Sequence, residues 1–231
     1  MALDDSNGSE RLGAVAPPRD FASLLPGRTV IPVIQIDAAD DAVPLAEALV
    51  SGGLKVLEVT LRTDAAIEAA ARIIEEVPQA IVGIGTVTRP EELKKVLDVA
   101  ARFAVSPGLT PGLAEAASAT GLPYLPGVST PSEVMLARSY DFFEMKFYPA
   151  VLAGGPAAIL NMATLFPDVS FCPTGGVTAG NLAQFLELEN VFSVGGTWVA
   201  PRELIAERKW REISALARAA ADIANAASVT G

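Results

Sequence analysis

The sequence predicts an α/β protein that folds as a (β/α)8 TIM barrel in a single domain. From Val30 onward, short apolar runs rich in β-branched residues alternate with helical stretches rich in Ala, Leu and Glu. The expected strands end at residues 36, 60, 86, 106, 128, 148, 174 and 195, a spacing of about 20–26 residues. Eight strand-then-helix units of this length form a parallel sheet that can close into a barrel. An open doubly wound sheet is the structural alternative.

Each expected strand is a short run of apolar and β-branched residues, as is typical of buried parallel strands. In chain order, these runs cover residues 30–36, 56–60, 81–86, 103–106, 124–128, 143–148, 170–174 and 191–195.

The expected helices have recognisable first and last turns. Several open with proline, whose missing N–H costs nothing in the first turn, and Gly52, Gly53 and Gly121 stand where helices are expected to end. The last helix has a regular apolar face around Ile213 and Ala217. In order, the helices cover residues 43–50, 65–76, 90–100, 111–119, 131–139, 156–163, 181–186 and 210–226.

Composition distinguishes an N-terminal tail from the barrel and indicates the cellular compartment of the protein. Residues 1–17 are polar and acidic and predict a flexible N-terminal tail, unlike a signal peptide, which leaves 18–231 for the barrel. No apolar run reaches the ~18 residues that a membrane helix needs, so no membrane partner is expected. Cys172 is the single cysteine, which excludes an intrachain disulfide and favours the cytoplasm.

Charge and residue usage exclude several classes of function. The formal net charge of −10 argues against binding to nucleic acid, although a small phosphorylated substrate stays compatible with it. Histidine is absent, which excludes Ser-His-Asp and Cys-His catalysis and His-ligated metals. Carboxylates, lysine, tyrosine and backbone dipoles are left to carry any chemistry.

Lys146 is the strongest catalytic candidate. It is one of five lysines and interrupts the apolar, strand-like run 143–149. Desolvation in such a run disfavours the charged ammonium and leaves part of it as free amine, the form that attacks a carbonyl to give a Schiff base. A lysine at a strand end that extends its charge into solvent is the structural alternative.

Strand alternation predicts which side chains share the barrel interior. In the second strand the apolar Leu57 and Val59 alternate with Glu58, so Glu58 is expected to point inward and to serve as an acid/base. The same alternation points Glu144 and Lys146 inward. A purely structural ion pair is the alternative for Glu58. Arg62, which follows the strand, is expected either to bind a substrate carboxylate or to cap the strand end.

Two glycine turns follow the last two expected strands and predict a phosphate site. They are Thr174-Gly175-Gly176 and Gly195-Gly196-Thr197. The loops after these strands are a frequent phosphate site in barrels, because bare backbone amides can approach the anion. Ordinary tight turns are the alternative. Thr86 and the Ser106-Pro107-Gly108 turn end two other strands and are candidates for lining the pocket, or are turn residues.

Taken together, these motifs resemble the 2-keto-3-deoxy-6-phosphogluconate aldolases, class I lyases of the Entner–Doudoroff pathway that are often also active on 4-hydroxy-2-oxoglutarate. The matching stretches are 53–63 (GLKVLEVTLRT), 81–87 (IVGIGTV), 105–110 (VSPGLT), 125–130 (LPGVST), 145–150 (MKFYPA), 171–177 (FCPTGGV) and 194–199 (VGGTWV). They occur in order across most of the chain between Val30 and Pro201.

The resemblance implies a role for each matched residue. Lys146 corresponds to the Schiff-base lysine and Glu58 to the acid/base. Arg62 and Thr86 correspond to the residues that bind the substrate carboxylate, with Pro107 and Thr174 lining the pocket. The implied phosphate cradle is Gly175, Gly176, Gly196 and Thr197. The family also implies a homotrimer, a phosphorylated keto acid as substrate, no metal, and no cofactor beyond the covalent lysine imine.

Three departures from the family pattern concern substrate preference. Tyr148 and Thr197 stand where phenylalanine and serine are usual, and the first strand ends in Asp37 where a more basic residue is familiar. A galactonate-derived epimer or 4-hydroxy-2-oxoglutarate is therefore an alternative main substrate. From other classes, a phosphosugar isomerase or epimerase would use Glu58 without a covalent lysine. A non-catalytic phosphate-binding barrel would not need Lys146.

Overall fold

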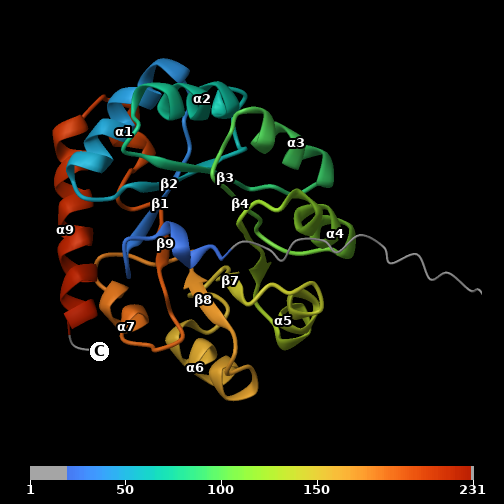
Figure 1. Cartoon of the computed structure of the whole chain (residues 1–231). Coiled ribbons are helices and arrows are strands. Elements are labelled where there is room, and N and C mark those ends of the chain that lie inside the picture. The colour runs from blue at the N-terminus through green and yellow to red at the C-terminus, as the bar shows by residue number, and fades with distance from the viewer. Residues whose placement is uncertain (1–19, 230–231) are drawn as a thin grey trace, which may run out of the picture.

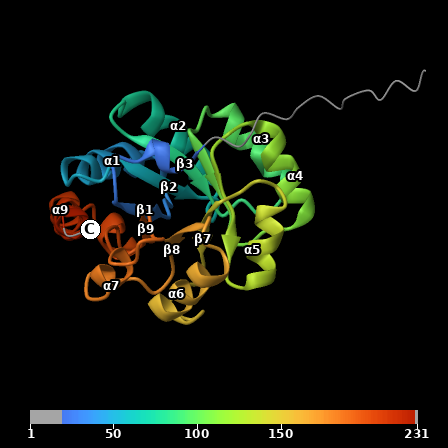
Figure 2. The same ribbon diagram turned by 60° about the horizontal axis from the view of Figure 1, so that its bottom comes forward.

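In the computed structural model, which describes residues 20–229, nine helices surround a closed set of parallel strands (Figures 1 and 2). The predicted tail, residues 1–17, lies outside the described residues. The strands are β1 (Val30–Ile34), β2 (Val56–Thr60), β3 (Ile81–Gly85), β4 (Phe103–Val105), β5 (Tyr124–Leu125), β6 (Gly127–Val128), β7 (Glu144–Phe147), β8 (Ser170–Pro173) and β9 (Val194–Gly196). The helices are α1 (Ala42–Ser51), α2 (Ala66–Glu76), α3 (Pro90–Asp98), α4 (Pro111–Thr120), α5 (Pro131–Arg138), α6 (Gly155–Leu165), α7 (Leu182–Leu186), α8 (Arg202–Ala206) and α9 (Trp210–Val229).

Pairing of the strands confirms the predicted barrel. One sheet has the order β5-β4-β3-β2-β1-β9 and the other the order β6-β7-β8. The two are joined at one side because β5 and β6 are a single extended segment interrupted at Pro126, which has no N–H to donate. On the other side, parallel bridges Phe171↔Val191 and Thr174↔Gly195 connect β8 to the segment of β9. The sheet therefore closes.

Two separate apolar clusters correspond to the two faces of the sheet. The larger cluster packs the outer face of the strands against the helices and includes Leu57, Val59, Met145 and Phe147. The smaller cluster fills the barrel interior, and its buried members are Phe21, Ile31, Val56, Phe103, Val105, Leu125 and Cys172. Alternate residues of each strand thus belong to different cores, as expected for a barrel.

The segment just before β1 adds to the interior cluster. Phe21 is buried, and its ring lies edge-on to Phe103 with the centroids 5.0 Å apart. Its backbone N–H and that of Ala22 donate to the Glu144 carboxylate at the start of β7, the first over 2.6 Å. This segment includes the short 3-10 helix η1 (Ala22–Leu24). Glu144 thus contacts the segment that packs into the barrel interior, which agrees with its predicted inward direction.

Several boundaries differ from the sequence prediction. The first strand ends at Ile34 instead of residue 36, and the last is centred later, on Val194–Gly196. Phe143, expected in the apolar phase of β7, is 40% exposed, because the strand begins only at Glu144. Helix α8 and the 3-10 helix η2 (Ala39–Asp41) were not predicted, since three to five residues are too few to show a helical period. Among residues 20–229, no helix is long and apolar enough to span a membrane.

Candidate active site

The amine of Lys146 and the carboxylate of Glu58 form an ion pair inside the barrel. Nζ of Lys146 lies 2.9 Å from Oε1 and 3.1 Å from Oε2 of Glu58. Both residues are buried, with 5% of Lys146 and 3% of Glu58 exposed. The two residues come from β7 and β2, and strand alternation directs both inward, as predicted. A buried amine beside a carboxylate is a pair that can exchange one proton and then act as nucleophile and acid/base.

Glycines on β3 create the space that the pair occupies. A Cβ atom on Gly85 would come within 2.6 Å of the Glu58 Cδ, and one on Gly83 would overlap the Phe103 ring. Parallel pairing sets Glu58 opposite Gly83 and Thr60 opposite Gly85. The missing side chains therefore let a carboxylate and a phenyl ring fill the same layer of the interior.

The surroundings of the lysine amine are aromatic and apolar. Nζ lies 5.8 Å from the centroid of the Tyr148 ring, within the range of a cation–π contact. Cys172 on β8 is the register partner of Lys146 and is buried. Burial raises the pKa of Cys172 to about 12, although the positive charge of Lys146 acts in the opposite direction. The thiol is therefore protonated near neutral pH.

Arg62 and Thr86 come together at the carboxyl ends of β2 and β3. The backbone N–H of Leu61 donates to the carbonyl of Gly85 over 2.9 Å, which joins the two strand ends. Arg62 is exposed, and within residues 20–229 its side chain has no hydrogen-bond or ion-pair partner. Thr86 has a φ of 61°, which a β-branched residue rarely adopts. Such strain is found more often at binding sites than elsewhere.

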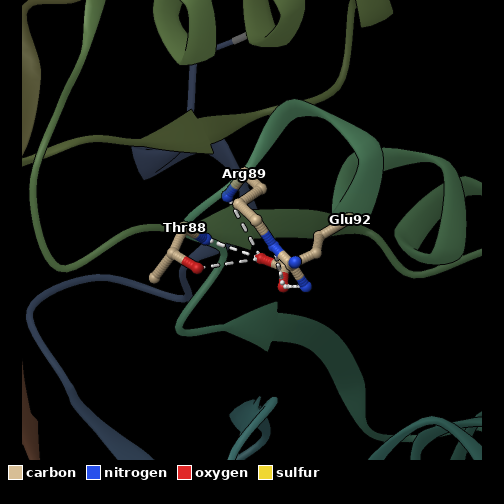
Figure 3. A network of polar contacts seen from close by, with 3 residues as sticks. All are labelled: Thr88, Arg89 and Glu92. Atoms are coloured by element: carbon tan, nitrogen blue, oxygen red, sulfur yellow. Dashed lines mark hydrogen bonds and ion pairs between the residues drawn. The ribbon is translucent and has the colours of Figure 1, made fainter.

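The loop that carries Thr86 is held by a compact polar network (Figure 3). The Glu92 carboxylate accepts from the backbone N–H of Thr88 over 2.7 Å and from that of Arg89 over 3.2 Å. The Arg89 guanidinium also donates to it, over 3.0 Å. Burial acts to raise the pKa of Glu92, but these hydrogen bonds together outweigh it and lower the pKa. The network keeps the start of α3, and thus the loop after β3, in one conformation.

The glycine turn after β8 lies beside the second glycine pair, Gly195 and Gly196, which the structure places within β9 instead of in the predicted turn. The Thr174↔Gly195 bridge brings the turn after β8 next to the end of β9. Gly175 and Gly176 have φ angles of 97° and 80°, which favour glycine. A Cβ on Gly175 would lie 3.2 Å from the Tyr148 ring, so this turn packs close to the aromatic neighbour of Lys146. Thr174 is buried, and Gly196 is buried beside the Trp198 ring.

Pro107 also lies near the lysine. Gly127 is the register partner of Lys146, and a Cβ atom on Gly127 would lie 2.5 Å from the backbone N of Gly108. The Gly127 N–H donates to the buried hydroxyl of Ser106 over 3.3 Å. The turn 106–108 therefore packs directly against the strand that flanks Lys146.

A cleft of about 320 Å³ opens over one side of the barrel. Two of the predicted binding residues, Arg62 and Thr197, line it, together with Gln35, Trp198 and Arg202. Its other lining residues are Val33, Thr60, Ala200, Pro201 and Glu203. The other predicted site residues do not line this cleft: Lys146, Glu58, Thr86, Pro107, Thr174, Gly175, Gly176 and Gly196.

Sequence reasoning missed three contributors to the site. Gly85 gave a signal, because a glycine in the middle of a buried strand indicates close approach of another group. Gln35 and Arg202 gave none, because only the closed barrel brings the end of β1 next to α8. In the described part of the chain, no cluster of three or more Cys, Asp or Glu residues is arranged to hold a metal ion.

Comparisons with known proteins point to one family. The model of the family described as "KDPG and KHG aldolase" matches residues 22–216. A 2-dehydro-3-deoxy-phosphogluconate aldolase of Dickeya dadantii is 47% identical over 197 residues, covering 85% of this chain and 92% of the relative. The KHG/KDPG aldolase of Escherichia coli K12 is 45% identical over 200 residues, covering 87% of this chain and 94% of the relative.

Solved structures agree with these sequence matches. The KDPG aldolase of Legionella pneumophila, crystallised with pyruvate captured as a covalent carbinolamine intermediate, superimposes with a TM-score of 0.82 at 43% identity. The alignment covers 84% of this chain and 94% of that one. The corresponding enzyme of Zymomonas mobilis ATCC 29191 also gives 0.82 at 43% identity, covering 89% and 98%.

Proposed function

This chain belongs to the KDPG and KHG aldolase family, and we propose that it cleaves 2-keto-3-deoxy-6-phosphogluconate reversibly through a Schiff base on Lys146. It is an aldolase, a lyase that breaks a carbon–carbon bond. The products are pyruvate and glyceraldehyde 3-phosphate. The observation that carries the proposal is the buried contact between Lys146 Nζ and the Glu58 carboxylate.

The ion pair is the resting form from which the reaction starts. Transfer of one proton from the ammonium of Lys146 to Glu58 leaves a neutral amine beside a neutral acid, with no net change in buried charge. The free amine attacks the C2 ketone of the substrate to give a carbinolamine. Glu58 then returns its proton to the carbinolamine hydroxyl, which leaves as water. This step gives an iminium ion that can accept the electrons of the C3–C4 bond, and it leaves Glu58 as a carboxylate again. A carbinolamine of pyruvate in the Legionella relative supports this sequence.

Glu58 then acts as the acid/base of the cleavage. As a carboxylate it accepts the proton of the C4 hydroxyl, directly or through a water. The C3–C4 bond breaks, its electron pair moves to C3 and the iminium nitrogen as an enamine, and the aldehyde leaves. The enamine is protonated at C3, and water hydrolyses the resulting iminium to free pyruvate and Lys146. The covalent lysine imine takes the place of a cofactor.

The binding residues divide between the two ends of the substrate. Arg62 and Thr86, joined at the ends of β2 and β3, bind the C1 carboxylate. Gly175, Gly176, Gly196 and Thr197 bind the phosphate through backbone N–H groups and a hydroxyl. Pro107 and Thr174 line the walls between them. The adjacency of the glycine turn after β8 to Gly195 and the nearness of Gly175 to Tyr148 support this division.

A second substrate is 4-hydroxy-2-oxoglutarate. The Escherichia coli relative carries the name KHG/KDPG aldolase, and the same Schiff-base steps apply to any 4-hydroxy-2-keto acid. A substrate of the galactonate series differs in configuration at C4, the carbon whose hydroxyl faces Glu58, and is the alternative within the same chemistry. A phosphosugar isomerase can be distinguished from an aldolase with any of these substrates, because the isomerase forms no imine with pyruvate.

The assembly and the location complete the proposal. We propose a homotrimer in the cytoplasm. Support for the first comes from exposed large apolar residues on and beside α5 and α6, which are Met135, Val151, Leu152, Leu160 and Leu165. The single cysteine supports the second. Light scattering of the purified chain tests the assembly, and a monomer at micromolar concentration would contradict it.

Reduction by borohydride in the presence of pyruvate tests the chemistry. We expect irreversible inactivation and a reduced pyruvyl adduct on the peptide that contains Lys146, identified by mass spectrometry. Borohydride without pyruvate serves as the control, because the amine then has no carbonyl compound with which to form an imine. Absence of an adduct on folded protein near neutral pH would exclude the Schiff base and favour the isomerase.

A further inference from the structure

Arg202 lies in the same cleft as the residues expected to bind the two ends of the substrate. It is the first residue of α8, and it lines the cleft together with Arg62, from the carboxylate end, and Thr197, from the phosphate end. Neither the sequence motifs nor the reaction steps above give it a role. Its position nevertheless puts a guanidinium within the space where a bound anion would be held.

The guanidinium of Arg202 is held from one side. Nη2 donates to Asp37 Oδ2 over 2.8 Å, and in the described part of the chain this is the one hydrogen bond of its side chain. Asp37 follows β1, so the pair joins the beginning and the end of the barrel. A guanidinium has five N–H donors, and four are therefore open to a second partner. Asp37 therefore orients the guanidinium and leaves most of its N–H donors free for a second partner.

The charges around the cleft indicate what that partner is. Thr197 offers a neutral donor to the cleft, whereas a phosphate ester carries about −1.5 to −2 at pH 7. Arg62 is assigned to the carboxylate end, and Glu203 adds a negative charge to the lining. Without Arg202, a phosphate would therefore face a neutral donor and a carboxylate. With Arg202, it gains a planar cation suited to paired hydrogen bonds with phosphate oxygens.

We infer that Arg202 determines specificity for the phosphorylated substrate by binding the phosphate together with Thr197, the member of the predicted phosphate cradle that lines the same cleft. This inference rests on the proposed function. Asp37 has a positioning role, since it holds the guanidinium over the cleft. Asp37 stands where a more basic residue is usual in the family, and here it pairs with a cation from α8, Arg202.

The condensation direction provides a sharp test, because the aldehyde can be supplied with or without its phosphate. Pyruvate is condensed with glyceraldehyde 3-phosphate or with glyceraldehyde, and kcat/KM is measured for each aldehyde. For Arg202→Gln we expect kcat/KM for the phosphorylated aldehyde to fall by about tenfold or more, as for loss of a hydrogen bond to a charged group. We expect the value for glyceraldehyde to change by less than about twofold.

Arg72→Gln is the matched control. Arg72 likewise pairs with an aspartate of the connection after β1, Asp40, but lies outside the cleft, so both aldehydes should react as with the unchanged chain. Arg202→Lys should recover part of the selectivity, because it restores a cation without the paired donors.

Two results would overturn the inference. Equal losses with both aldehydes would show that Arg202 only supports the loop, and an unchanged ratio would show that it does not meet the phosphate. Pyruvate trapping on Lys146 in the same Arg202→Gln preparation distinguishes failure of the role given to Arg202 from failure of the Schiff-base mechanism. Retained trapping with unchanged selectivity overturns the role of Arg202 alone, whereas failure of trapping in the unchanged chain overturns the proposed function itself.

Discussion

Lys146 and Glu58, 88 positions apart in the sequence, meet inside the barrel with Nζ 2.9 Å from Oε1 and almost no access to solvent. Taking two charges out of water is costly, and their attraction repays this only when the geometry is good and both stay charged together. A pair of this kind is weak evidence for stability. In the proposed mechanism, the pair keeps a nucleophilic amine and a proton acceptor within reach of the same substrate.

The first prediction concerns Glu58. For Glu58→Gln we expect kcat of the cleavage to fall by about 10²–10⁴-fold, the usual contribution of an acid/base, because an amide cannot accept the C4 hydroxyl proton. KM should change much less. Steady-state kinetics measure both, and an unchanged kcat would show that the carboxylate only balances the charge of Lys146.

The second prediction concerns the energetic cost of the pair. For Lys146→Met we expect no turnover and a loss of about 3–5 kcal/mol in the free energy of unfolding, because Glu58 is left buried and uncompensated. The double variant Lys146→Met/Glu58→Leu should recover most of that stability and none of the activity. Urea denaturation followed by circular dichroism provides the measurement. A double variant as unstable as the single one would show that the interior cannot accept an apolar pair.

The third prediction concerns the room that Gly85 provides. A methyl group at this position would come within 2.6 Å of the Glu58 Cδ, so Gly85→Ala should displace the carboxylate and lower kcat by about 10²-fold, as a misplacement of about 1 Å does. Gly112→Ala is the control, since nothing lies within 4 Å of its Cβ position. Equal kinetics for both variants would contradict the role given to the glycine.

The fourth prediction is a dependence of stability on pH. Burial raises the pKa of Glu144 to about 7, and a hydrogen bond with Asp20 adds to the rise. Because the pKa is higher in the folded chain, the protonated group favours folding below about pH 4.5, and this contribution is lost as the pH rises through about 7. Since Glu144 is only partly buried, we expect a loss on the order of 1 kcal/mol.

Glu144→Gln should remove this part of the pH dependence, because the amide does not titrate. Unfolding by urea at several pH values between 4 and 8 measures it. The same slope in Glu144→Gln as in the unchanged chain would assign the dependence to other groups.

The fifth prediction compares two loops of the same design. Glu92 and Glu133 each accept backbone N–H groups at the start of a helix, over 2.7 Å from Thr88 and from Ser129 respectively. Either substitution by Ala should lower the free energy of unfolding by about 1 kcal/mol. In addition, Glu92→Ala should raise KM severalfold, because its loop carries Thr86, whereas Glu133→Ala should leave KM unchanged. Equal KM values for Glu92→Ala and Glu133→Ala would show that the Glu92 network does not affect substrate binding.

Much of this molecule follows from local patterns in the sequence. The period of the strand runs predicts eight strand-and-helix units, and alternation within β2 and β7 predicts that Glu58 and Lys146 point inward. Both outcomes depend on the two-residue repeat of a strand, which any tertiary structure must respect. Short elements such as α8 leave no such pattern, and the strand boundaries at Phe143 and Ile36 depend on neighbouring strands.

The sequence by itself determined the fold class, the inward direction of Lys146 and Glu58 and the glycine turn after β8, because each is expressed in residues close together in the chain. Only the tertiary structure decided which atoms meet: the distance between Lys146 and Glu58, the room left by Gly85, and the place of Arg202 in the cleft. These contacts join segments dozens of residues apart. The closing of the barrel sets their geometry, and no local pattern records it.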